Sequence, residues 1–247
     1  MGVYRELEPS PALREHLACV WYQTVGPDEP ALLQRVLPDA CIDLVWEARD
    51  VPRIAGPDTG PMLAPLAPGA LLVGARFRPG RGPDVLGVAA TELRDGQPEL
   101  AAVWGDAASR RLRESDATGS LPAMLALIQR EVEARLAGAR PVDPCAPAAV
   151  AWARGRSELP RLGADLGLGE RQLRRRVEER FGYGPAVLRR VLRLQRLLSL
   201  MARHPSSLSE LALAAGYADQ AHMTRECQRL AGLSPARLLA ERLPTAP

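Results

Sequence analysis

The sequence contains no lysine, and all 32 basic residues of this 247-residue chain are arginine. The codon bias of a GC-rich genome is the simplest cause, but the physical consequence holds whatever the cause. Arginine presents a planar fork of N–H donors that can form two hydrogen bonds at once with a phosphate group or a guanine edge. Every basic contact that the chain makes is therefore an arginine contact.

Histidine and cysteine are also scarce, which excludes several kinds of site. The cysteines form no CxxC pair and the histidines form no cluster, so the sequence argues against a zinc site and a disulfide framework. No nucleophile elbow and no triad motif is present either. We therefore expect no metal, no cofactor and no enzyme activity. The scattered residues are Cys19, Cys41, Cys145, Cys227, His16, His204 and His222.

Long apolar runs are missing as well. No run reaches the length that a membrane span needs, and the first residues lack a charged-then-apolar signal segment. Apolar residues nevertheless make up 47% of the chain, which is enough to build packed cores. We expect a soluble, cytoplasmic protein of two modest domains with no membrane partner.

Charge divides the chain into two halves. Residues 151–247 hold 17 arginines against nine acidic residues, a net charge of +8, whereas residues 1–150 have a net charge of −5. A stretch with three prolines in ten residues separates the halves, and no regular element tolerates that composition. We predict a first domain at 1–138, a linker at 139–146 and a polyanion-binding domain at 147–247.

The first domain has the pattern of short strands followed by helices. Runs rich in Val, Leu, Ile and Trp alternate with glycine–proline pairs, which is typical of a β-sandwich or barrel. The predicted strands are 17–25, 32–37, 41–47 and 71–78, and the predicted helices are 98–114 and 121–136. The second helix carries an apolar stripe that either mediates self-association as a homodimer or packs on the strands.

The second domain is predicted to be all helical and contains a repeat. A short helix, a glycine turn and a second helix occur at 159–185 and again at 208–235. The matched residues are offset by 49 positions up to Gly167 and Gly216 and by 50 positions beyond them, so the extra residue falls in the turn. This unit is a helix-turn-helix, whose second helix can enter a DNA major groove. The fold class is therefore α+β, with two such motifs joined by a long helix over 185–203.

Each second helix has an apolar face and a polar face. The residues expected in the core are Leu173, Val177 and Phe181 in the first copy, and Met223, Cys227 and Leu230 in the second. The other face of the first copy is arginine-rich, and that of the second carries Gln, Thr and Arg. Gln pairs with adenine, Arg pairs with guanine, and Thr or Ala contacts a thymine methyl group.

Residues 147–242 resemble the DNA-binding domain of the AraC/XylS family of bacterial transcription regulators. The matching segments are Leu166-Gly167-Leu168, Arg171-Gln172-Leu173, Phe181-Gly182-Tyr183-Gly184-Pro185, Gly216-Tyr217, Asp219-Gln220, Thr224-Arg225, Gly232 and Ser234-Pro235. The resemblance implies a sequence-specific transcription regulator, more often an activator, whose partners are double-stranded operator DNA and RNA polymerase. It places the base-contacting positions at Arg171, Arg174, Arg175, Gln220, Ala221, Thr224 and Arg225.

The segments 37–46 and 74–80 are similar to a poorly characterised β-rich domain found ahead of AraC-type domains. The best-known sensor domains of the AraC/XylS family are cupin-like barrels that bind small effectors. The similarity therefore implies a cupin-like fold and a role in sensing a small-molecule effector or in dimerisation, without naming a ligand. The aromatic residues fit a core as well as they fit a pocket. The candidate pocket residues are Trp21, Cys41, Asp43, Trp46, Arg76 and Phe77.

Two other functions stay open at this point. One is a DNA-repair or alkyl-transfer protein with an AraC-like domain, although such proteins need an activated, usually zinc-held cysteine. The other is a regulator without a ligand, whose first domain only dimerises. A polar-lined cavity in the first domain would favour the sensor role.

Overall fold

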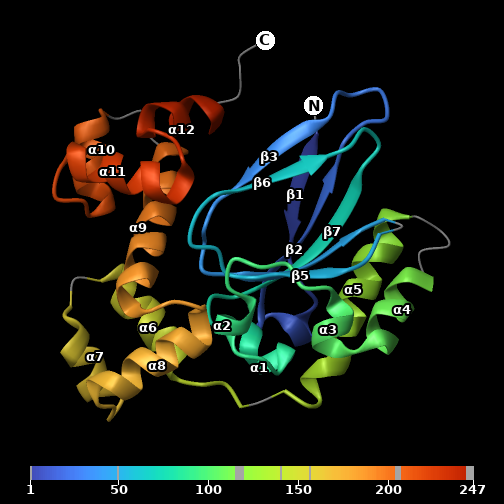
Figure 1. Ribbon diagram of the computed structural model, residues 1–247, viewed down its shortest axis with the longest axis horizontal. Helices are drawn as coiled ribbons and strands as arrows, with labels where there is room; N and C mark the ends of the chain where they lie inside the picture. The colour runs from blue at the N-terminus through green and yellow to red at the C-terminus, as the bar shows by residue number, and fades with distance from the viewer. Residues whose placement is uncertain are drawn as a thin grey trace.

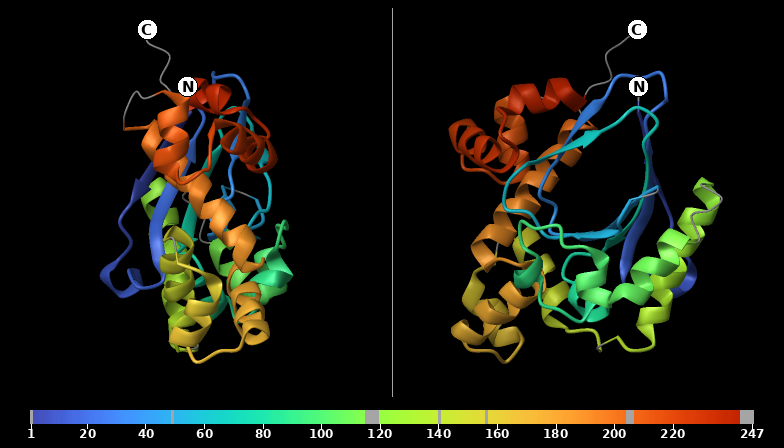
Figure 2. Two further views of the ribbon diagram at one scale, coloured as in Figure 1. Left: turned by 90° about the vertical axis from the view of Figure 1, so that its left-hand side faces the viewer. Right: turned by 45° about the vertical axis from the view of Figure 1, so that its right-hand side comes forward.

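The computed structural model describes residues 2–48, 50–114, 120–139, 141–155, 157–203 and 207–242. It has a β-rich part covered by helices and an all-helical part beside it, which is the predicted two-domain α+β class (Figures 1 and 2). None of the helices within these ranges is long and apolar enough to cross a membrane.

Seven strands form the β-rich part. Five of them make an antiparallel sheet in the order β1-β2-β7-β4-β5, and the other two, β3 and β6, pair only with each other as a ribbon. Because no backbone ladder joins ribbon and sheet among the described residues, the closed barrel that the strand spacing suggested does not form. The strands are β1 (Val3–Leu7), β2 (Leu17–Thr24), β3 (Leu32–Val36), β4 (Ile42–Glu47), β5 (Arg53–Ala55), β6 (Met62–Leu66) and β7 (Leu71–Phe77).

The two faces of the sheet differ, as the alternation along β7 shows. Val73, Ala75 and Phe77 are completely buried on one face, whereas Arg76 lies on the other. Successive side chains of a strand point to opposite faces, so the first face collects apolar residues and packs against helices. The second face collects polar residues and faces the β3–β6 ribbon.

Helices cover the apolar face. Gly105, at a φ of +83°, divides the helix predicted over 98–114 into two, because only glycine adopts this backbone conformation readily. The apolar stripe of α5 packs against β7 and β2, with Met124, Ile128 and Val132 completely or almost completely buried. Of the two roles predicted for this stripe, self-association or packing on the strands, the structure shows the packing. The helices are η1 (Pro11–Leu13), α1 (Gly82–Leu86), α2 (Ala90–Leu93), α3 (Leu100–Trp104), α4 (Asp106–Glu114) and α5 (Leu121–Leu136).

The helical part contains two helix-turn-helix units on either end of α9. Side chains cap the starts of two of its helices: Ser207 with Glu210 starts α10, and the Asp219 side chain accepts a 2.6 Å hydrogen bond from the backbone of His222 to start α11. The helices are α6 (Cys145–Arg154), α7 (Leu159–Asp165), α8 (Glu170–Phe181), α9 (Pro185–Met201), α10 (Leu208–Ala215), α11 (Gln220–Ala231) and α12 (Pro235–Arg242).

Helix α6 begins at Cys145, two residues before the predicted start of the second domain at residue 147. The carboxylate of Asp143 accepts a 2.9 Å hydrogen bond from the Cys145 backbone N–H, which satisfies one of the free donors at the helix start. Cys145 and Ala146 are completely buried, so these residues of the proline-rich stretch already belong to the helical core.

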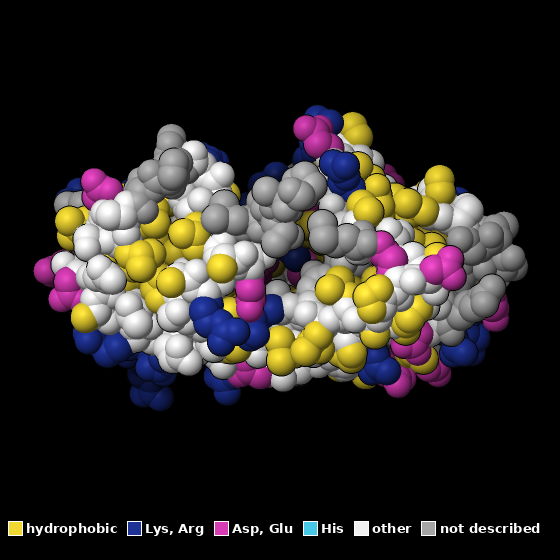
Figure 3. Space-filling view, turned by 90° about the horizontal axis from the view of Figure 1, so that it is seen from above, with side chains coloured by type: hydrophobic (Ala, Val, Ile, Leu, Met, Phe, Trp, Pro, Cys, Tyr) yellow, Lys and Arg dark blue, Asp and Glu magenta, His cyan; other side chains and the backbone are white. Residues whose placement is uncertain are grey.

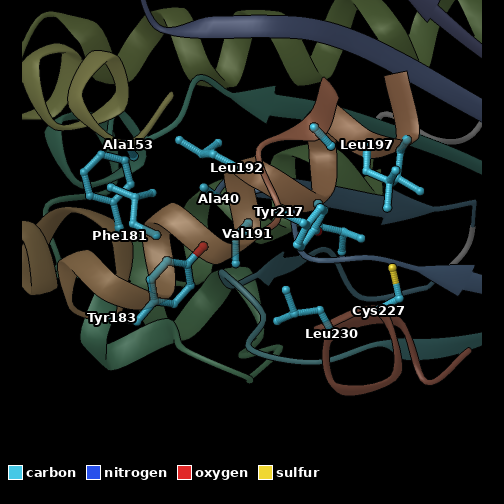
Figure 4. Packing of buried hydrophobic residues seen from close by; sticks show 14 of the residues in the cluster. Ala40, Ala153, Phe181, Tyr183, Val191, Leu192, Leu197, Tyr217, Cys227 and Leu230 are labelled. Atoms are coloured by element: carbon cyan, nitrogen blue, oxygen red, sulfur yellow. The ribbon is translucent and has the colours of Figure 1, made fainter. Parts of the chain in front are cut away.

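The core of the helical part surrounds α9 and reaches into the β-rich part. Ala40, from the loop between β3 and β4, is buried in this core beside side chains such as Val191 and Leu192 (Figure 4). The amide of Gln195 donates a 2.6 Å hydrogen bond to the carbonyl oxygen of Pro38 in the same loop. The two parts therefore share an interface as well as a linker.

Candidate DNA interface and ligand cavity

The second helix of each unit, α8 and α11, has the predicted buried face. Leu173, Val177 and Phe181 anchor α8, and Met223, Cys227 and Leu230 anchor α11, with every one of these side chains no more than 2% exposed. Burying one face fixes the rotation of each helix, so the opposite face is presented to solvent.

The exposed face of α8 is arginine-rich. Arg174 forms an ion pair with Glu170 at 3.1 Å, and Arg175 forms one with Glu179 at 3.5 Å, both one helical turn apart. Arg171 is exposed and has no ion pair or hydrogen bond among the described residues. Exposed pairs of this kind contribute little to stability, so these arginines can exchange a carboxylate for a phosphate or a base at low cost.

The exposed face of α11 combines polar and small side chains. Gln220, Ala221 and Arg225 are exposed and Thr224 is half-buried. The Thr224 hydroxyl donates to the Gln220 carbonyl oxygen at 2.9 Å, and the Gln220 amide oxygen accepts from Ser209 at 3.0 Å. Arg225 has no ion pair or hydrogen bond within the described ranges. All seven predicted base-contacting residues therefore lie on the free faces of the two helices.

A basic groove lies between the two helix-turn-helix units. Helix α9, with 17 residues, separates them by about 25 Å at the α-helical rise. A cavity of ≈ 330 Å³ is lined by Arg174 of α8, by His222 and Glu226 of α11, and by Arg189, Arg190 and Arg193 of α9. Seen from the top of Figure 1, arginine side chains gather along one edge of the helical half (Figure 3).

The β-rich part contacts the carboxyl ends of α8 and α11. Arg94 donates a hydrogen bond to the carbonyl oxygen of Gly182 at 3.2 Å, and Arg35 donates one to the carbonyl oxygen of Ala231 at 3.3 Å. Gly182 and Gly232 are equivalent positions of the repeat, and each ends its helix with a positive φ. The contacts thus hold the carboxyl ends of α8 and α11 and leave their amino ends free.

A second site lies on the polar face of the sheet. A cavity of ≈ 960 Å³ is enclosed by this face, by the β3–β6 ribbon and by Gln195 of α9. Of the six predicted pocket residues, four line it: Trp21, Cys41, Asp43 and Arg76. Trp46 and Phe77 do not, because strand alternation places them on the other face, where both are completely buried in the core.

A polar network occupies the floor of the cavity. The Trp21 indole donates to Asp43 at 2.7 Å, and the Arg76 Nε donates to the same carboxylate at 3.2 Å. Burial raises the pKa of Asp43, and the guanidinium of Arg76 opposes that rise. Arg76 also contacts Glu6 at 3.3 Å and Asp39 at 3.5 Å, so one cation is shared by three carboxylates.

Several cavity residues were missed from the sequence. Gln23 shares the β2 face with Trp21, and the two-residue spacing could have indicated it. Tyr4 and Glu6 belong to β1, which was not predicted, because this edge strand is short and exposed throughout. Asp58 lies in a loop without a sequence signal; partial burial and the carboxylates of neighbouring acids raise its pKa to about 6.

The four cysteines are all free and buried. Burial raises the pKa of Cys19 and of Cys227 to about 12, and it also raises the pKa of Cys41 and Cys145. A thiol of raised pKa forms little thiolate, which is the nucleophilic species. The described residues therefore offer no activated thiol of the kind that an alkyl-transfer enzyme needs.

Comparison with known families gives two matches. Residues 162–241 match a helix-turn-helix domain of AraC type, and residues 5–99 match a domain of unknown function (DUF6597). The C-terminal part of the chain is an AraC-type helix-turn-helix domain. Such a domain is the DNA-binding part of a transcription regulator.

Solved structures of ToxT from Vibrio cholerae are similar to this chain at low identity. The crystal structure from strain O395 has a TM-score of 0.48 and 10% identity, covering 92% of this chain and 97% of ToxT. The unsaturated fatty acid-bound ToxT from strain SCE256 has a TM-score of 0.46 and 10% identity, covering 100% and 97%. No curated protein matches the chain.

Proposed function

We propose that the chain is a sequence-specific transcription regulator that acts as an activator. It inserts α8 and α11 into successive major grooves of operator DNA. The observation that carries this proposal is the exposure of Arg171 and Arg225 on equivalent faces of two helices anchored in one core. Arginine with no internal partner is available to a guanine edge or a phosphate. RNA polymerase is the expected protein partner, and the cytoplasm is the expected place of action.

The β-rich part is proposed to sense a small-molecule effector. The ≈ 960 Å³ cavity supports this role over that of a domain that only dimerises, because its volume and its mixture of polar and aromatic walls suit a ligand. A homodimer remains part of the proposal, but the α5 stripe does not provide its surface, since that stripe packs on the sheet.

Alanine substitutions on the two recognition helices test the mechanism. Arg171→Ala and Arg225→Ala should each weaken operator binding by about 1–3 kcal/mol and relax preference at different base positions, roughly one turn of DNA apart. Genomic footprinting identifies the operator, and fluorescence anisotropy on single-base variants of it measures the preference.

A charge-matched control separates base contacts from overall charge. Arg110→Ala removes an exposed arginine of α4, in the β-rich part, and should leave operator binding unchanged apart from a small general loss. Equal effects of all three substitutions, or unchanged selectivity in Arg171→Ala and Arg225→Ala, would contradict the assignment.

A further inference from the structure

The cavity beneath the β3–β6 ribbon carries an excess of negative charge. Among the residues that the structure describes, seven carboxylates and three guanidinium groups line it, and no histidine does. The acidic residues are Glu6, Asp39, Asp43, Glu47, Asp50, Asp58 and Asp95, and the arginines are Arg35, Arg53 and Arg76. A cleft with an excess of charge of one sign attracts a ligand of the opposite sign.

The internal ion pairs leave this excess in place. Arg76 is shared by Glu6, Asp39 and Asp43, and Arg35 is paired outside the cavity with Glu241 at 3.5 Å. Arg53 is the remaining cation of the described lining. Two lining carboxylates, Asp58 and Glu47, have no hydrogen bond and no ion pair among the residues that the structure describes. No group of three metal-ligating side chains converges anywhere in those residues, so the acids are spread along the walls.

A buried hydrogen-bond acceptor without a partner also favours a ligand that carries N–H donors. Gln23 is 4% exposed and lines the cavity from β2, yet its amide oxygen Oε1 receives no hydrogen bond. A buried acceptor left without a donor destabilises the folded state. A ligand that brings N–H donors would satisfy it, whereas a carboxylate would not.

The aromatic wall suits the apolar part of such a ligand. Trp21 lies against Gly74 of β7, where an added Cβ atom would stand 2.1 Å from the indole ring, so glycine is required there. The Tyr4 ring lies beside it, with ring centroids 5.8 Å apart. Indole and phenol faces attract organic cations.

We propose that this cavity binds an organic cation, a primary amine or guanidinium compound with an apolar body. Its N–H donors meet Gln23 and the unpaired carboxylates, and its apolar body lies against Tyr4 and Trp21. The proposal rests on the sensor role proposed above and names the chemical class of the effector.

Matched probes test the charge of the ligand. Phenethylamine and hexylamine carry the cation, hydrocinnamate carries an anion on a similar body, and phenylethanol is neutral. Isothermal titration of the full chain without DNA should show binding of the amines and not of the other two. Because DNA is absent, a failure here is distinct from a failure of operator binding. Equal binding of hydrocinnamate, or no amine binding at millimolar concentration, overturns the proposal.

Three variants locate the site. Asp58→Asn and Gln23→Met should each weaken amine binding about fivefold, as expected for the loss of one partly exposed charge or one hydrogen bond. Glu133→Gln removes the same charge as Asp58→Asn from an exposed position on α5 and should leave binding unchanged. Amine affinity that is the same in all three variants overturns the assignment to this cavity, and thermal unfolding of each variant confirms that it is folded.

Discussion

Arg35 of β3 donates a 3.3 Å hydrogen bond to the carbonyl oxygen of Ala231, the last residue of α11. The same arginine lines the ligand cavity. One side chain therefore joins the cavity wall to α11. Arg94 makes a similar contact to Gly182, the residue after α8, but does not line the cavity.

This difference predicts distinct effects of two substitutions. Arg35→Ala and Arg94→Ala each remove one hydrogen bond at the carboxyl end of α11 or α8, at about 1 kcal/mol. Arg35→Ala also removes the partly exposed ion pair with Glu241, which contributes little. Hydrogen exchange should become faster at the end of α11 in the first variant and at the end of α8 in the second. Indistinguishable exchange patterns in the two variants would show that the contacts do not act locally.

Two glycines give a test of the interface between the parts. Gly182 and Gly216 both end helices at positive φ, so Gly216→Ala should cost about 1 kcal/mol from backbone strain alone. An added Cβ at Gly182 would lie 2.6 Å from Pro57 Cγ, whereas Gly216 faces open space. Gly182→Ala should therefore cost about 1–3 kcal/mol more. Chemical denaturation measures both, and equal losses would mean that the two parts do not dock in solution as described.

Asp58 predicts a dependence of stability on pH. Its pKa is raised to about 6, mainly by burial and then by Asp95, so the folded state retains a proton that the unfolded state releases. The carboxylate therefore lowers stability as pH rises from about 4 through about 6. Asp58→Asn should stabilise the protein by on the order of 1 kcal/mol at about pH 7.5, after allowance for solvent screening, and hardly at all at about pH 4. Thermal unfolding at both pH values, with the exposed Asp28→Asn as control, checks this; a gain that is the same at both would exclude the titration as its cause.

The start of α6 predicts where the DNA-binding domain can be separated. A fragment over 147–247 lacks the buried Cys145 and Ala146 and the Asp143 carboxylate, which also binds Arg180 at 3.2 Å. We expect it to be less stable than a fragment over 141–247 by about 2 kcal/mol or more. Urea denaturation compares the two fragments, and equal midpoints would mean that these residues contribute nothing.

The longer fragment should still bind the operator with sequence preference. Its basic charge predicts an affinity that falls steeply with salt, because each phosphate contact releases counterions. Mobility-shift titrations at two salt concentrations measure this. A folded fragment without sequence preference would show that the β-rich part is needed for recognition itself.

The helical part was predictable because its signals are local. Asp219 and the Ser207–Glu210 pair mark helix starts through contacts within four residues, and Gly216 marks a helix end. The apolar spacing that buries Leu173 and Val177 needs no knowledge of the rest of the chain. These short-range rules were sufficient to locate both motifs and their exposed faces.

The cavity was only partly predictable because its walls come from distant segments. Alternation alone could have separated Asp43 from Trp46, since residues three apart in a strand point to opposite faces. Strand β6 was missed because Pro65 interrupts its pattern, yet it forms half of the ribbon that encloses the cavity. The position of Gln195 over the cavity depends on how α9 docks, and nothing near it in the sequence encodes that.

The buried ion pair between Arg180 of α8 and Asp84 of α1 has a consequence for protein engineering. Asp84 is 2% exposed and belongs to the β-rich part. In a chimera with a foreign sensor domain, Arg180 would therefore lose this buried partner. The AraC-type domain therefore cannot be joined to another sensor domain without further changes. A transplant that keeps its operator would have to carry the segment around Asp84 with it, or replace Arg180 by an apolar residue.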